Sequence, residues 1–318
     1  MRFDKYEWIA ISIMVSLFIL VGFVQGWSVS LVILNMCIIS AIMTMGVNIS
    51  WGYAGVINFG VMGFLAMGGL AAVLVSYPPV REAWHVGGSG LGISFILLAA
   101  LVTAVYFITK LVEKKSHKYW LNGLVIFFGL IIIRYFFLNA TARIEEVDPA
   151  LAGFLGGANL PIIFSWVVGG FFAGGVAFVI GKVALGLRSD YLAIVTLGIS
   201  EIVVSVLKHE EWLSRGVKNV IGLKRPVPYE INLQNSEWFI NIVTWFNSSK
   251  LNNIIDPDTK QEVLNNLIID GSGIFVKLNY ALLFFIVMIV IYYFANKAQI
   301  SPWGRMMRAI RDNEVSAN

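Results

Sequence analysis

The C-terminal stretch, Ser301–Asn318, gathers side chains that suit recognition of another molecule. It reads SPWGRMMRAIRDNEVSAN and follows an apolar run without charge, Leu278–Ala295. At helical spacing, its apolar residues share one side: Trp303, Met306, Met307 and Ile310. Charged residues share another side: Arg305, Arg308 and Asp312. The sequence therefore predicts an amphipathic helix that lies along a surface.

Ion pairs within this stretch are too weak to hold it by themselves. Arg308 and Asp312 form an i, i+4 pair, and Arg311 and Glu314 form an i, i+3 pair. Each pair contributes only about 0.2–0.5 kcal/mol, so contact with something else must help to stabilise the helix. Three interpretations are open: a positively charged cytoplasmic flank, an amphipathic turn that faces lipid, or a docking helix for a soluble partner.

One carboxylate, Glu201, falls inside a predicted apolar span. If its helix begins near Ser189, Glu201 lies about 18 Å along it at a rise of 1.5 Å per residue. An acidic side chain at that depth is costly unless it is paired or hydrated. Glu201 is therefore expected either to have a functional role or to be satisfied by a neighbouring helix.

A glycine-rich stretch, Trp51–Leu70, reads WGYAGVINFGVMGFLAMGGL and brings polar Asn48 and Asn58 close in sequence. Small residues let membrane helices approach closely, so packing alone could explain the composition. The alternative is a broken or re-entrant segment that lines a substrate path. Irregular backbone at membrane depth is tolerated only around a cavity or within protein.

The sequence lacks the residue clusters of an enzyme. The three histidines fall in separate loops without an HExxH pattern: His85, His117 and His209. Gly181-Lys182 is not preceded by the glycine that a nucleotide-binding P-loop requires. The single cysteine, Cys37, excludes an intrachain disulfide. We expect no cofactor or metal in this chain, so a second chain must hydrolyse ATP if ATP drives transport.

Composition identifies a polytopic helical membrane protein. Hydrophobic residues make up 58% of the chain and charged residues 13%, whereas a soluble domain carries about 25% charged residues. The mean hydropathy is +0.78. The net charge of +4 is assigned to cytoplasmic loops, and we expect no nucleic-acid partner.

Eight apolar spans are predicted within a single transmembrane domain, 1–318. They fall near residues 8–26, 28–46, 52–76, 92–110, 119–138, 163–185, 189–207 and 278–296. The first two could also form one bent element around Gly26. Eight crossings place the basic loops and the N-terminus on the cytoplasmic side. The long polar segment 208–277 then faces outward, either as an ordinary insertion or as a docking surface for a substrate-delivering protein.

Two long stretches and the glycine-rich segment carry a family resemblance. Residues 186–202 read GLRSDYLAIVTLGISEI, and residues 301–317 read SPWGRMMRAIRDNEVSA. They resemble the RGDYLAIVTLGFGEI and SPWGRALRAIREDEVAA segments of ABC importer permeases for branched-chain amino acids, the LivM type. Gly52–Gly69 is similar to the GxxGxxxxG segment of that family. Ser189 stands where glycine is usual.

The resemblance implies an all-α fold, a transmembrane helical bundle of the ABC importer permease type. It implies that residues 297–318 form a cytoplasmic coupling segment with these ATPase-coupling residues: Arg305, Arg308, Arg311 and Glu314. It also implies that a core span near the translocation path contains Tyr191, Thr196 and Glu201. We add two residues of the glycine-rich region to the candidate path: Asn48 and Asn58.

The implied assembly is a bacterial inner-membrane importer of branched-chain amino acids. Its other members would be a homologous permease subunit, two ATPase subunits that bind ATP and Mg²⁺, and a periplasmic binding protein. A urea or short-amide importer is the alternative, and an ion-coupled secondary transporter that uses Glu201 is a rival. Family members continue beyond the coupling stretch into further spans, so we expect the sequence that ends at Asn318 to be truncated.

Overall fold

The computed structural model describes residues 5–112, 114–149, 153–184, 187 and 189–312. Regular structure in these residues is helical, and six helices are long and apolar enough to cross a membrane. Two shorter apolar helices cover Trp8–Val24 and Val61–Ser76. These helices fall in the eight apolar segments predicted from the sequence, except that the segment 52–76 is helical only at residues 52–53 and 61–76. The chain divides into two compact units, the first from residues 1–58 and 225–318, the second from residues 59–224.

The first unit begins with two separate helices, α1 (Lys5–Val24) and α2 (Trp27–Asn48). Between them Gly26 takes φ 98° and ψ 150°, a conformation that is essentially restricted to glycine. Ser30 Oγ donates to the Phe18 carbonyl oxygen at 2.8 Å and ties the two helices together. The interpretation of this region as one bent element is therefore wrong.

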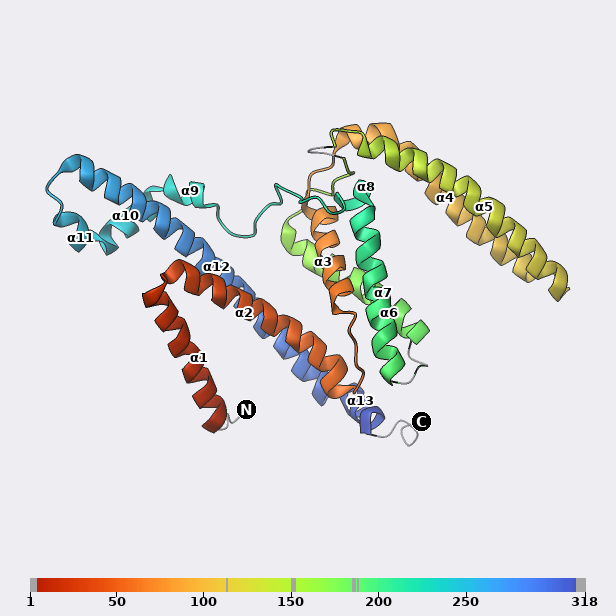
Figure 1. Ribbon diagram of the computed structural model, residues 1–318, viewed down its shortest axis with the longest axis horizontal. Coiled ribbons are helices and arrows are strands. Elements are labelled where there is room, and N and C mark those ends of the chain that lie inside the picture. The colour runs from red at the N-terminus through yellow and green to blue at the C-terminus, as the bar shows by residue number, and fades with distance from the viewer. Residues whose placement is uncertain (1–4, 113, 150–152, 185–186, 188, 313–318) are drawn as a thin grey trace. The chain divides into compact units, whose positions relative to one another are not determined.

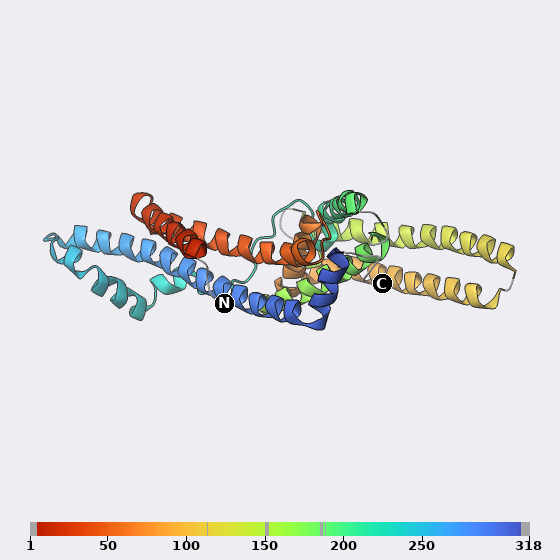
Figure 2. The same ribbon diagram turned by 90° about the horizontal axis from the view of Figure 1, so that it is seen from below.

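Helix α12 (Pro257–Ile300) is far longer than the predicted span 278–296. Its 44 residues extend about 66 Å at 1.5 Å per residue, about twice the 30 Å hydrocarbon core of a bilayer. Asp256 caps its first turn by accepting from the Thr259 backbone N–H at 3.1 Å, and Pro257 pre-sets the first helical residue. Helix α12 packs along α2 (Figures 1 and 2), and Asn35 Nδ2 of α2 donates to the Lys277 carbonyl oxygen of α12 at 3.0 Å.

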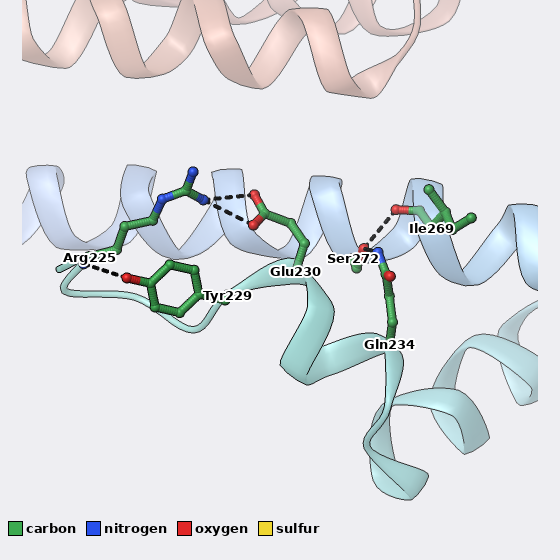
Figure 3. A network of polar contacts seen from close by, with 6 residues as sticks. All are labelled: Arg225, Tyr229, Glu230, Gln234, Ile269 and Ser272. Carbon is green, nitrogen blue, oxygen red and sulfur yellow. Dashed lines mark hydrogen bonds and ion pairs between the residues drawn. The ribbon is translucent and has the colours of Figure 1, made fainter. Parts of the chain in front are cut away.

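Three short helices pack on the preceding part of α12 and form what we call the cap: α9 (Glu230–Gln234), α10 (Glu237–Phe246) and α11 (Ser248–Asn252). Phe239 and Val243 of α10 are buried against Ile268 of α12. Figure 3 shows the polar contacts of α9, in which Gln234 Nε2 donates to Ser272 Oγ at 2.9 Å. The apolar residues inside the polar segment 208–277 thus have a small core of their own.

Arg225 and Glu230 form the other part of that network (Figure 3). Arg225 Nη1 lies 3.1 and 3.0 Å from the two carboxylate oxygens of Glu230. The Arg225 backbone N–H also donates to the Tyr229 hydroxyl at 3.4 Å. These contacts tie the chain that enters the cap to the start of α9.

In the second unit, α3 (Val61–Ser76) packs against α6 (Ile162–Ala184) and α7 (Ser189–His209). A Cβ at Gly63 would lie 3.2 Å from the Ser200 Cα, so glycine permits the close approach of α3 and α7. A Cβ at Gly169 of α6 would likewise lie 3.3 Å from the Gly68 Cα of α3. Packing of small residues is therefore one part of the role of the glycine-rich stretch.

The second unit also holds a long helical hairpin, α4 (Arg81–Leu111) and α5 (Lys115–Glu145), seen in Figure 1. Gly90 lets the helices meet, since its Cβ would lie 2.8 Å from the Ala140 Cβ. Near its open end the hairpin joins the rest of the unit, where Trp84 Nε1 donates to the Leu155 carbonyl oxygen at 3.0 Å. Trp212 of α8 (Glu211–Ser214) packs edge-on against Phe137 at the same end.

Candidate coupling and translocation site

The predicted amphipathic helix is present as α13 (Pro302–Asp312), which follows α12 after a sharp turn at Ser301. Ser301 Oγ accepts from the Gly304 N–H at 3.4 Å and donates to the Ala298 carbonyl oxygen at 2.6 Å. A Cβ at Gly304 would overlap the carbonyl oxygens of Ala298 and Gln299, so only glycine fits there. Proline at the first helical position favours the new helix start. The Ser-Pro-Trp-Gly sequence therefore sets the angle at which α13 leaves α12.

Two of the predicted coupling arginines bind the end of α12. Arg305 Nη1 donates to the Ile300 carbonyl oxygen, and Arg308 Nη2 donates to the Gln299 carbonyl oxygen, each at 3.3 Å. The last carbonyl groups of a helix have no partner within it, and these guanidinium groups supply one. Both arginines thus stabilise the α12–α13 turn.

The ion pair predicted between Arg308 and Asp312 is wrong. Among the described residues, Asp312 pairs with its neighbour Arg311, whose Nη2 lies 2.9 Å from Asp312 Oδ1. The nearer partners of Arg308 are carbonyl oxygens at the turn, and they compete with the i, i+4 pair. The exposed Arg311–Asp312 pair contributes little to stability. Glu314, the fourth predicted coupling residue, lies outside the described residues.

Arg311 also connects α13 to the end of α2. Helix α2 continues into a π-helical turn, η1 (Ile49–Tyr53), and Arg311 Nη1 donates to the Gly52 carbonyl oxygen at 3.0 Å. Gly55, with φ 69°, lies directly under the Arg311 side chain, since a Cβ there would stand 2.6 Å from Arg311 Cγ. We call this contact of Arg311 with Gly52 and Gly55 the Arg311 junction. It joins the predicted coupling segment to a predicted path segment within one unit.

The apolar side of α13 is exposed. Trp303 and Met306 keep 46% and 51% of their surface accessible, and Ile310 keeps 36%. A helix whose charged side is bound to its own chain while its apolar side stays open is suited to contact another molecule. The interpretation of α13 as only a positively charged cytoplasmic flank does not explain why its apolar side is exposed.

The backbone is irregular between η1 and α3, from residue 54 to residue 60, as one interpretation of the glycine-rich stretch predicted. In the second unit, two hydroxyl groups of α7 satisfy the amides where α3 begins. Thr196 Oγ1 accepts from the Phe59 N–H at 3.2 Å, and Ser200 Oγ accepts from the Gly63 N–H at 2.7 Å. Both side chains are 2% exposed. An unpaired amide at membrane depth is costly, and the Thr196 hydroxyl satisfies the Phe59 amide. The Ser200 bond adds to a backbone bond that the Gly63 N–H makes to the Gly60 carbonyl oxygen at 3.1 Å.

Thr196 was a predicted path residue, and the structure gives it this supporting role. Its hydroxyl also donates to the Ala193 carbonyl oxygen at 2.9 Å, so its own proton is used within α7. Sequence reasoning missed Ser200. The sequence feature that could have identified Ser200 is its i, i+4 spacing from Thr196, which puts two small hydroxyl residues on one side of a mostly apolar helix.

The other predicted path residues present polar groups at the surface of their units. On α7, Tyr191 is 60% exposed and Glu201 is exposed, and Glu201 has no hydrogen bond or ion pair within the described part of the chain. The described residues therefore do not show the alternative in which a neighbouring helix pairs with the Glu201 carboxylate. In the first unit, Asn48 lies over Gly52 and lines a groove of about 610 Å³, and Asn58 is half-buried. Asn48 thus adjoins the Arg311 junction.

No group of three or more histidine, cysteine, aspartate or glutamate side chains that could hold a metal ion is found in the described ranges. The polar groups described above are carbonyl, hydroxyl, amide and guanidinium groups held by neighbouring backbone. They can position backbone and bind a partner or a polar solute.

Residues 149–318, more than half of the chain, match the family described as branched-chain amino acid transport system, permease component. The chain belongs to this family. The matched region includes the α7 hydroxyl pair, the cap, α12 and α13. Searches of curated proteins and of solved structures gave no match. The permease is thus a multi-pass membrane protein with all-helical architecture, and its α4–α5 hairpin lies before the matched region.

Proposed function

We propose that this permease is the LivM-type membrane subunit of an ATP-driven importer for branched-chain amino acids. The observation that carries the proposal is α13, whose arginines bind the permease itself while its apolar side remains open. That side would dock on a cytoplasmic ATPase subunit. ATP and Mg²⁺ would bind to two such subunits and not to the permease.

The basic residues of the short loops support a cytoplasmic N-terminus and a cytoplasmic α13 in the bacterial inner membrane. In that orientation the cap, within residues 208–277, stands on the opposite side, where a periplasmic binding protein would deliver the substrate. Exposed aromatic residues of α10, such as Trp245 at 77%, give the cap a surface for protein contact. A homologous permease subunit would complete the translocation path.

Transport would follow from movement of α13 relative to the ATPase subunits. Arg311 would pass that movement to η1 and Asn48 through the Arg311 junction. Thr196 and Ser200 would keep the start of α3 satisfied while helices around the path rearrange. Tyr191 and Glu201 are two exposed polar groups of α7 that would face the path or the second permease subunit.

A matched pair of tryptophan substitutions tests the docking proposal. Trp303→Asp places a charge on the apolar side of α13, whereas Trp245→Asp places the same charge on the cap. We expect Trp303→Asp to abolish co-purification of the permease with its ATPase subunits, and Trp245→Asp to retain it. Equal retention of the ATPase subunits by both variants would refute docking through α13.

Transport measurements distinguish the substrates. In proteoliposomes that hold the assembled importer and its binding protein, we expect ATP-dependent uptake of leucine, isoleucine and valine. ATP-dependent uptake of urea or a short amide in place of these amino acids would support the alternative importer. Uptake that follows an ion gradient without ATP hydrolysis would refute the ABC importer.

A further inference from the structure

Helices α1, α2 and α12 of the first unit enclose an apolar groove of about 630 Å³. Its walls are aliphatic and aromatic side chains together with the thiol-bearing residue Cys37. Along α12 the groove extends from Leu278 to Met288, about 15 Å at 1.5 Å per residue. That length equals one leaflet of a hydrocarbon core about 30 Å thick. The groove therefore has the depth and the apolar lining that an acyl chain requires.

A cluster of polar groups lies at one end of this groove, one helical turn from Ala281 of its wall. Lys277 is half-buried there, and its Nζ donates to Ser28 Oγ. Asn35 donates to the Lys277 carbonyl oxygen, and the buried Asn35 Oδ1 has no partner within the described residues. The ammonium group and the hydroxyl group are the donors that the site offers to an anion; the Asn35 amide oxygen can only accept.

The ammonium group of Lys277 has no counter-charge among the described residues. No carboxylate pairs with it in the part of the chain that the structure describes. Tyr280 lies on the next turn of α12 after Lys277, and Glu230 of α9 is close to it. Glu230 is already paired with Arg225. The local charge is therefore one positive unit beside an apolar groove, where an anionic group is favoured.

We propose that this groove binds an anionic phospholipid, with one acyl chain between α1, α2 and α12 and the headgroup phosphate at Lys277 and Ser28. The lipid phosphate supplies the missing negative charge and accepts hydrogen bonds from the ammonium group. A zwitterionic lipid carries the same phosphate but also a compensating cation, so it gains less from Lys277. Selectivity for anionic lipid distinguishes this site from general contact with the bilayer.

Cys37 provides a direct readout because it is the only cysteine of the chain and lines the groove. The importer complex is purified in neutral detergent, and modification of Cys37 by a maleimide is followed by mass spectrometry of its peptide. Dioleoylphosphatidylglycerol and dioleoylphosphatidylcholine are titrated separately. We expect phosphatidylglycerol to protect Cys37 at a concentration about fivefold lower than phosphatidylcholine, the effect of one cationic residue on an anionic lipid.

Substitutions assign that preference to Lys277. Lys277→Met should remove the difference between the two lipids, and Lys277→Arg should retain it. Lys297→Met, at the other end of α12, removes the same charge from the same helix and should leave the preference unchanged. Lys277→Arg also shows whether a loss in Lys277→Met arises from charge and not from misfolding.

Three results would overturn the proposal. They are equal protection by the two lipids in the wild type, a preference that persists in Lys277→Met, and a Cys37 that resists the maleimide without added lipid. The last result would show that a protein segment fills the groove.

Discussion

Substitution of Gly55 by alanine should uncouple α13 from α2, and the Arg311 junction gives the size of the effect. At φ 69° an L-residue pays about 1–2 kcal/mol of backbone strain. The added Cβ would also stand 2.6 Å from Arg311 Cγ and 3.3 Å from Arg311 Cβ, so the Arg311 side chain must move. That movement breaks the hydrogen bond to the Gly52 carbonyl oxygen, worth about 0.5–1.5 kcal/mol at a partly exposed site.

A double-mutant cycle separates these two costs. Gly55→Ala alone should destabilise the permease by about 1.5–3.5 kcal/mol, the sum of strain and the displaced contact. In an Arg311→Ala background the 2.6 Å clash with Cγ and the hydrogen bond are already gone, so Gly55→Ala should cost little more than the strain. The double variant is therefore expected to be more stable than additivity predicts, by about 1 kcal/mol.

Gly26→Ala is the matched control for strain. Gly26 also has a positive φ, 98°, but a Cβ there would have nothing within 4 Å. Gly26→Ala should therefore lower the unfolding free energy by the same amount in the wild type and in the Arg311→Ala background.

The assay combines thermal unfolding of the purified complex with the ratio of amino acid transported to ATP hydrolysed. We expect this ratio to fall in Gly55→Ala and Arg311→Ala and to remain unchanged in Gly26→Ala. If Gly55→Ala and Arg311→Ala destabilise the permease additively within about 0.5 kcal/mol, the two residues are not coupled, and the proposed transmission through them is incorrect.

Three further predictions concern other described sites. Ser200→Ala removes one of two acceptors of the Gly63 N–H, which also donates to the Gly60 carbonyl oxygen at 3.1 Å, so it should cost about 0.5–1.5 kcal/mol of unfolding free energy, measured by thermal unfolding. Trp245→Ala, at a residue that is 77% exposed, is the control and should change the unfolding free energy by no more than about 0.5 kcal/mol. Glu201→Gln should leave stability unchanged within about 0.5 kcal/mol, because the described residues provide no partner for that carboxylate, yet it should reduce uptake in proteoliposomes; full uptake would remove Glu201 from the path. Hydrogen bonds from Thr259 hold the pKa of the Asp256 carboxyl below its ordinary value of 3.8, so its stabilisation is complete above that value and is lost as the pH falls through the lower folded-state pKa. The melting-temperature difference between wild type and Asp256→Ala should therefore shrink below about pH 4, and a constant difference down to pH 2 would contradict this assignment.

The positions of the membrane helices were predictable because a span needs about 20 consecutive apolar residues, a pattern that survives without tertiary information. The ends of the helices were less predictable. Helix α12 begins at Pro257, well before its apolar run, because its polar first half is stabilised by packing against Phe239 and Val243 of the cap. Charged residues between the apolar ones obscured that helical face in the sequence.

Composition, loop charges and the Ser301–Asn318 pattern by themselves identified a multi-pass helical membrane protein and an amphipathic helix in its last residues, and the family resemblance added the permease. These properties follow from local spacing and from the cost of burying charge in lipid, so they can be read from the residues alone. Only the tertiary structure decided the partners of the polar groups. Arg311 bonds a carbonyl oxygen 259 residues away, and Ser200 satisfies an amide 137 residues away. Such contacts depend on which backbone groups a broken helix leaves unpaired, and that is settled only when the helices are packed together.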